Sequence, residues 1–155
     1  MFGISFIIQS CGTSKIDFSQ IQNKVFQNDF TFVAQHFDNR KTYSAPSGTG
    51  RIMSTSVAVT SSEVIGVIVH PDKLTVNLPV NEKEVDINKS SLEFISYDFT
   101  VARSTLENGN ILLNFFLNDV KDISIIKMEV QKNGRIDCSV EGPQLKPLLY
   151  TGNID

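Results

Sequence analysis

From residue 30 onward, apolar side chains recur at every second position in short runs, which is the spacing of β-strands. In the first run, four residues are predicted to share one face of a strand: Phe30, Phe32, Ala34 and His36. Further runs follow at close spacing and predict more strands. They cover residues 52–60, 64–69, 74–78, 92–102, 111–117, 123–131, 135–140 and 147–154.

A different period precedes these strands. Segment 17–28 carries apolar residues at the spacing of one helix face, namely Phe18, Ile21, Val25 and Phe26. Asp17 or Ser19 is suited to cap the helix, because the side-chain oxygen can accept a hydrogen bond from a free backbone N–H group. The sequence therefore predicts one short helix ahead of the strands.

The sharpest turn signal is Asn133-Gly134, which lies between two alternating arms. Asn-Gly tolerates the two successive positive φ angles of a type I′ turn, so it predicts a two-residue hairpin. The apolar face of this hairpin is predicted to carry Met128, Val130, Ile136 and Cys138. The opposite face carries Glu129, Gln131, Arg135 and Asp137.

Many short strands joined by tight turns are typical of a mainly β protein. A parallel sheet is excluded, because its crossovers need long connections, usually helices, and none follows residue 30. We expect an antiparallel β-sandwich or flattened barrel of about eight to nine strands with one short N-terminal helix. Residues 17–155 fit a single antiparallel β domain.

Residues 1–16 have another character. Residues 6–8 form an apolar run, Ser10 and Cys11 follow it, and residues 12–15 are small or polar. This order resembles the lipobox of bacterial lipoproteins, in which the cysteine is lipidated and becomes the mature N-terminus. Acyl chains would hold a soluble domain at a membrane, since each buried CH₂ contributes about 0.8 kcal/mol. We expect a lipoprotein signal remnant and tether, lipidated at Cys11.

Two features depart from that pattern. Gln9 is polar where a small or aliphatic residue is usual, and the apolar run is short and has no basic segment before it. A true start upstream of Met1 would explain both. The alternative is that residues 1–8 form a first strand and that Cys11 is an ordinary buried thiol.

The second cysteine, Cys138, lies in a predicted strand and is expected to be a small core residue. A disulfide between Cys11 and Cys138 is the alternative, because an oxidising compartment would permit it.

Charge and composition argue against two classes of protein: nucleic-acid binders and proteins with an apolar segment that spans a bilayer. The formal net charge is −3 and no stretch concentrates Lys and Arg on one face, so nucleic-acid binding is disfavoured and we expect no nucleic-acid partner. No segment reaches the roughly 20 apolar residues that span a bilayer.

The C-terminal third carries the motifs that resemble a known family: residues 118–122 (NDVKD), Asn133-Gly134 and residues 149–154 (LYTGNI). Residues 30–35 are similar to the family's first strand. On these motifs, over roughly residues 30–154, the chain resembles the Bacteroidetes lipoprotein family catalogued as domain of unknown function 4251. The resemblance implies a fold and a membrane anchor, and no activity. After Leu78-Pro79 the chain lacks the family's usual two aromatic residues and Gly.

No residue set in the sequence is specific for a reaction. His36, His70 and the two cysteines are too few and too dispersed for a metal site, so we expect no metal and no cofactor. No Gly-x-Ser-x-Gly elbow is present, and residues 47–50 lack the Lys and helix of a phosphate loop.

Acidic residues cluster at Glu82 with Glu84 and at Asp119 with Asp122. Paired carboxylates serve glycosidases and calcium sites, but solvated turn positions are the simpler interpretation.

We therefore expect a membrane-anchored periplasmic domain, on the inner leaflet of the outer membrane, that is not an enzyme and acts as an interaction or structural module. Its protein or small-molecule partner stays unidentified. The alternative is a carrier of a small apolar ligand or lipid, with a lipocalin-like cavity of about 300 Å³ or more. Its support is the surplus of phenylalanine near strand centres: Phe94, Phe99, Phe115 and Phe116. A hydrolase would need a His close to an acid and a nucleophile.

Overall fold

The computed structural model describes residues 17–38, 56–58, 65–80 and 91–155. Within these residues the chain forms one helix and ten strands. They are α1 (Phe18–Phe26), β1 (Phe30–Asp38), β2 (Ser56–Ala58), β3 (Gly66–His70), β4 (Lys73–Pro79), β5 (Ser91–Ser96), β6 (Phe99–Thr105), β7 (Ile111–Leu117), β8 (Ile125–Val130), β9 (Arg135–Gly142) and β10 (Leu145–Ile154).

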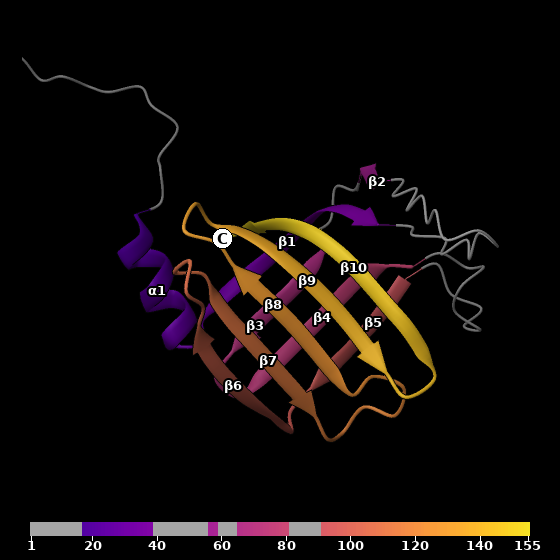
Figure 1. Cartoon of the computed structure of the whole chain (residues 1–155). Coiled ribbons are helices and arrows are strands. Elements are labelled where there is room, and N and C mark those ends of the chain that lie inside the picture. Colours follow the sequence, from indigo (N-terminus) through magenta and orange to yellow (C-terminus); the bar gives the residue numbers. More distant parts are fainter. Residues whose placement is uncertain (1–16, 39–55, 59–64, 81–90) are drawn as a thin grey trace, which may run out of the picture.

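Nine strands form one sheet in the order β5-β4-β3-β1-β10-β9-β8-β7-β6, and β2 pairs with β1. Every neighbouring pair is antiparallel. The sheet curls over on itself, so that the β6–β10 layer crosses steeply in front of β3, β4 and β5 (Figure 1). The predicted mainly antiparallel β fold with one short helix is therefore confirmed, in the form of a flattened half-barrel.

Helix α1 lies beside one end of the barrel, near β6 (Figure 1). Its N-cap is Asp17, whose carboxylate accepts a hydrogen bond from the Ser19 N–H group. At the other end, the Arg103 guanidinium donates to the Phe26 carbonyl (2.7 Å) and lies 5.7 Å from the centre of the Phe26 ring. This β6 side chain thus holds the end of α1, while buried Ile21 and Val25 of the helix face the core.

Large apolar side chains from both layers fill the interior. Tyr150 of β10 is buried among them, and its hydroxyl donates a 2.8 Å hydrogen bond to the Pro79 carbonyl of β4. Burial also raises the pKa of this phenol. The largest fully buried side chains are Tyr150, Phe32, Phe115, Ile21, Leu74, Leu78, Ile111, Leu113, Ile123, Ile126, Met128 and Ile136.

The alternation predicted for the first strand holds through Ala34 and then reverses. The register of β1 against β10 shifts between Ala34 and His36. Beyond this bulge Phe37 is buried, with its ring stacked 5.6 Å from that of Tyr150, while His36 is exposed. The prediction that His36 shares a face with Phe30 is wrong, because a bulge adds one residue and moves later side chains to the opposite face.

The predicted strand 92–102 is two strands, β5 and β6, with a corner at Tyr97-Asp98. The backbone N–H groups of Tyr97 and Asp98 both donate to the carboxylate of Asp119, at 2.8 and 3.2 Å. The chain can therefore turn here without leaving these donors unpaired. The prediction of one strand is wrong because the carboxylate comes from a distant part of the sequence.

The hairpin at Asn133-Gly134 is confirmed, but its turn is not of type I′. Among the described residues, Asn28 is the non-glycine residue with a positive φ, so Asn133 does not have one, whereas Gly134 has φ +87°. Gln131 accepts from the Gly134 N–H group (3.0 Å) and donates to the Arg135 carbonyl (2.8 Å). The loop therefore has three residues with a left-handed glycine at the end, which is a bulged turn.

Candidate functional site

The sequence proposed Cys11 as the lipidation site, and Cys11 lies outside the described residues. Cys138 is a buried free thiol of β9, as expected for a core residue. Burial raises the pKa of this thiol far above its usual range, because the interior disfavours the charged thiolate. Cys138 therefore fits a packing role and not that of a nucleophile.

The two histidines lie on separate elements. His36 is exposed on β1, opposite Thr151 of β10. His70 ends β3, with its Nδ1 atom 3.5 Å from Asp29 Oδ1. Within the described residues, no group of three or more His, Cys, Asp or Glu side chains could hold a metal ion.

Of the predicted acidic clusters, Glu82 and Glu84 lie outside the described residues, and Asp119 has a structural role. One Asp119 oxygen accepts from the hydroxyl of Ser96, which is fully buried, and the other accepts the two corner N–H groups. These hydrogen bonds, that of Ser96 above all, hold the pKa of Asp119 below its usual value of 3.8. The carboxylate is thus committed to the β5–β6 corner and not to a pair with Asp122.

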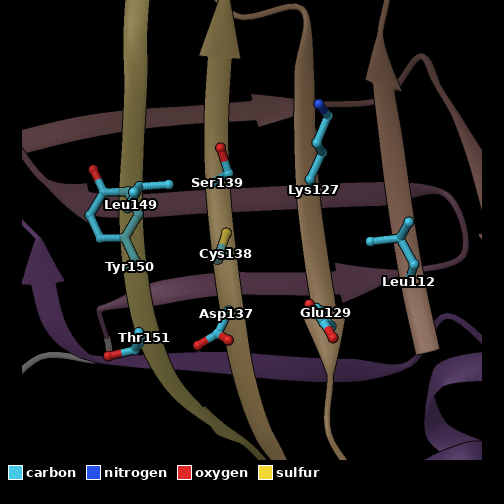
Figure 2. A pocket seen from close by; sticks show the side chains of 9 residues that line it. All are labelled: Leu112, Lys127, Glu129, Asp137, Cys138, Ser139, Leu149, Tyr150 and Thr151. Carbon is cyan, nitrogen blue, oxygen red and sulfur yellow. The ribbon is translucent and has the colours of Figure 1, made fainter. Parts of the chain in front are cut away.

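A groove of about 390 Å³ lies on the outer face of the sheet, across β7, β8, β9 and β10. Figure 2 shows the side chains that line it, which come from all four strands. They are Leu112, Lys127, Glu129, Asp137, Cys138, Ser139, Leu149, Tyr150 and Thr151. The groove is open to solvent, and most of its lining surface is apolar.

The strand register explains how these residues meet. Residues opposite one another on neighbouring strands lie side by side on the same face of the sheet. Pairing across the four strands therefore makes two parallel rows on the outer face. The first row is Leu112, Glu129, Asp137 and Thr151; the second is Asn114, Lys127, Ser139 and Leu149.

The first row contains two carboxylates directly opposite each other, Glu129 on β8 and Asp137 on β9. Glu129 accepts a hydrogen bond from the Asn110 side-chain amide (2.9 Å), and Asp137 accepts one from the Gln131 amide (3.4 Å). The Arg135 Nε atom lies 3.9 Å from Asp137, and both side chains are about half exposed. The row therefore keeps an excess of negative charge.

In the second row, Lys127 forms an ion pair with Glu141, at 3.1 Å between Nζ and Oε2. Ser139 donates to the other oxygen of the same carboxylate at 3.3 Å. The positive charge next to the groove is thus already matched within the protein.

His36 lies opposite Thr151, at the end of the first row. An imidazole, a hydroxyl and an acid thus share one face, but Thr151 lies between His36 and Asp137, and no hydrogen bond joins His36 to a described acid. In a hydrolase relay the histidine stands between the acid and the nucleophile. The order seen here is different.

Sequence reasoning missed the groove and its opposed carboxylates. It assigned Glu129 and Asp137 to the polar face of the hairpin, yet it looked for acidic pairs only among sequence neighbours. The signal was present, because the two residues lie at equal distances from the loop and must pair across it.

The described part of the chain has no helix that is both long and apolar enough to cross a membrane.

A family model described as a domain of unknown function (DUF4251) matches residues 13–154. No curated protein matches the chain significantly. Among solved structures, the chain is similar to the crystal structure of a DUF4251 family protein from Bacteroides eggerthii, with 15% sequence identity and a TM-score of 0.59. The match covers 88% of this chain and 85% of that chain. At this identity the likeness concerns the fold alone.

Proposed function

The chain belongs to the family described as a domain of unknown function (DUF4251), and we propose that it is a membrane-anchored periplasmic lipoprotein domain that acts as a non-catalytic interaction module. The anchor is the lipid on Cys11, on the inner leaflet of the outer membrane. Support for the anchor comes from the apolar run before Cys11 and the small, polar residues after it.

The observation that carries the interaction role is the position of the groove. In the described residues, the space between the two layers is filled by side chains such as Phe32, Phe115 and Tyr150, whereas the groove opens on the outside of the sheet. A carrier of apolar ligands needs an interior cavity, while a docking module needs a surface hollow. The packing therefore favours docking over transport.

The non-catalytic role is supported by the bonding within the groove. Lys127 forms an ion pair with Glu141, and the Ser139 hydroxyl donates to the same carboxylate, so the cation and the acid of the second row already have partners within the protein. We therefore assign recognition rather than chemistry to this face.

One experiment in intact cells tests both parts. The full-length chain carries a photo-crosslinking benzoylphenylalanine at Leu149, in the groove, or at Thr75, on the other layer. We expect the protein in the membrane fraction, with acyl mass on Cys11, and a discrete adduct with one envelope component only from Leu149. Cys11→Ser should move the protein to the soluble fraction, and Cys138→Ala should not.

Either part can fail separately. Membrane partitioning that Cys11→Ser leaves unchanged, together with no acyl mass on the wild-type chain, would refute the anchor. Identical adducts from Leu149 and Thr75 would refute the groove as the contact surface.

A further inference from the structure

The opposed carboxylates break a local rule of sheet stability. Like charges directly across two antiparallel strands repel, and such pairs usually cost stability. Glu129 and Asp137 nevertheless face each other across β8 and β9, and among the described residues their side-chain hydrogen-bond donors are the neutral amides of Asn110 and Gln131. Arg135, at 3.9 Å from Asp137 and more than half exposed, offsets only part of this repulsion, and a local rule broken in this way is typical of a functional surface.

We propose that the groove receives an extended, cationic segment of a partner protein, with a Lys or Arg side chain between Glu129 and Asp137. This inference rests on the proposed docking role and names the chemistry of the partner. The argument is charge complementarity, because a basic side chain would bring positive charge to Glu129, which has no ion pair among the described residues, and would add to the exposed Arg135 contact of Asp137.

Within the part of the chain that the structure describes, the cations next to the groove do not fill that role. Lys127 is paired with Glu141 at 3.1 Å, and Arg135 approaches only Asp137, at 3.9 Å and with more than half of its side chain exposed.

The shape of the groove indicates an extended segment with apolar residues beside the cation. Leu112 and Leu149 lie on its outermost strands, β7 and β10, and the carboxylates lie between them. The hydroxyls of Ser139 and Thr151 line the same hollow and can bind backbone groups of the segment. A chain that lies across the strands would place its apolar side chains on the two leucines and its basic one on the carboxylates.

The test uses the full-length protein and two fluorescent heptapeptides, acetyl-Leu-Ser-Leu-Lys-Leu-Ser-Leu-amide and the same peptide with Gln in place of Lys. Fluorescence anisotropy measures binding, and the anisotropy should rise with the Lys peptide only. The double variant Glu129→Gln/Asp137→Asn should weaken binding about tenfold, as expected for the loss of two partly exposed charge contacts. The matched control Glu93→Gln/Asp72→Asn removes the same charge from exposed positions on β5 and the β3–β4 turn and should not change the affinity.

The double variant should fold, because it relieves a repulsion; its urea midpoint should equal or exceed that of the wild type. Equal binding of the Lys and Gln peptides, or equal loss in the control variant, would overturn the cationic inference while the docking role stands. No binding of either peptide would also overturn it and would leave the crosslinking result unaffected. If spermidine displaces the Lys peptide at a concentration equal to that of the peptide, the groove is a site for free amines, and the proposal of a protein partner is wrong.

Discussion

Asp119 shows how one exposed side chain can determine the path of the backbone. Its carboxylate accepts hydrogen bonds from the Ser96 hydroxyl and from the N–H groups of Tyr97 and Asp98. An ionised carboxylate only accepts hydrogen bonds, so it matches three donors at once. Ser96 is the buried polar residue of the described core, and without Asp119 its hydroxyl would lose this charged partner.

We predict that Asp119→Asn lowers the urea midpoint at pH 6, because the amide presents N–H donors where the wild-type site also has donors. The pKa of Asp119 is lower in the folded state than in the unfolded state. Its contribution to stability is therefore fully present at a pH above the unfolded-state pKa and is lost as the pH falls through the folded-state pKa. The urea midpoint of the wild type should therefore decrease when the pH is lowered below about 4, and the midpoint of the variant should decrease less. An equal decrease of the urea midpoint in the wild type and the variant between pH 6 and pH 3 would contradict this role of Asp119.

At the scale of elements, the two hairpins β6–β7 and β8–β9 have the same loop. Leu106 accepts from the Gly109 N–H group (2.9 Å), as Gln131 accepts from Gly134, and both glycines are left-handed, with φ +86° and +87°. In each loop an asparagine side chain accepts from the backbone N–H group two residues on, at 3.0 Å. The shared Asn-Gly sequence therefore gives a shared bulged turn.

The surroundings of the two glycines differ and lead to a prediction. A Cβ atom on Gly134 would lie 3.1 Å from Ile154 Cγ2 and 3.6 Å from Ile21 Cδ1, in the core, whereas one on Gly109 would meet only the Lys132 side chain, which can move into solvent. Both Gly→Ala variants should lose about 1–3 kcal/mol of unfolding free energy to backbone strain. Gly134→Ala should lose more, as measured by urea denaturation. A larger loss for Gly109→Ala would show that the packing against α1 and β10 does not restrict the loop.

At the scale of the whole molecule, the two layers are joined where β1 pairs with β10, and they pack against each other through the core. The bulge in β1 lies where the sheet passes from one layer to the other, consistent with the bend that a bulge introduces. Inside, the Tyr150 hydroxyl is hydrogen-bonded to the Pro79 carbonyl of the opposite layer. This bond ties β10 to β4, which are not neighbours in the sheet.

We predict that Tyr150→Phe lowers the free energy of unfolding by about 1–3 kcal/mol, because it removes the side-chain donor to the partly buried Pro79 carbonyl. The far-ultraviolet circular dichroism should stay unchanged, since the ring still packs on Phe37. The control is Tyr97→Phe at the exposed corner, where 67% of the residue is accessible and the urea midpoint should not move. An unchanged midpoint for Tyr150→Phe would mean that water satisfies the Pro79 carbonyl.

Local periodicity was enough to predict much of the fold. The helix, the strands and the inward set around Ile136 and Cys138 follow from side-chain spacing, because burial of one face selects a period of 3.6 or 2. The antiparallel arrangement followed from the lack of crossover helices, and the structure selects Asp17 from the two predicted caps, Asp17 and Ser19. The hairpin at Asn133-Gly134 was predicted from the turn preference of Asn-Gly, but the predicted two-residue loop is wrong, because the loop has three residues. Asn-Gly suits more than one hairpin turn, and the hydrogen bonds of Gln131 decide between them.

Only the tertiary structure decided the features that join distant segments. The bulge at His36, the corner held by Asp119 and the groove all depend on which strand lies beside which. Leu112 and Thr151 share one row because β7, β8, β9 and β10 pair in register, and no local pattern contains that information. Spacing along the chain determines which face a side chain takes, whereas contacts between strands determine its neighbours, and a binding surface is made of neighbours.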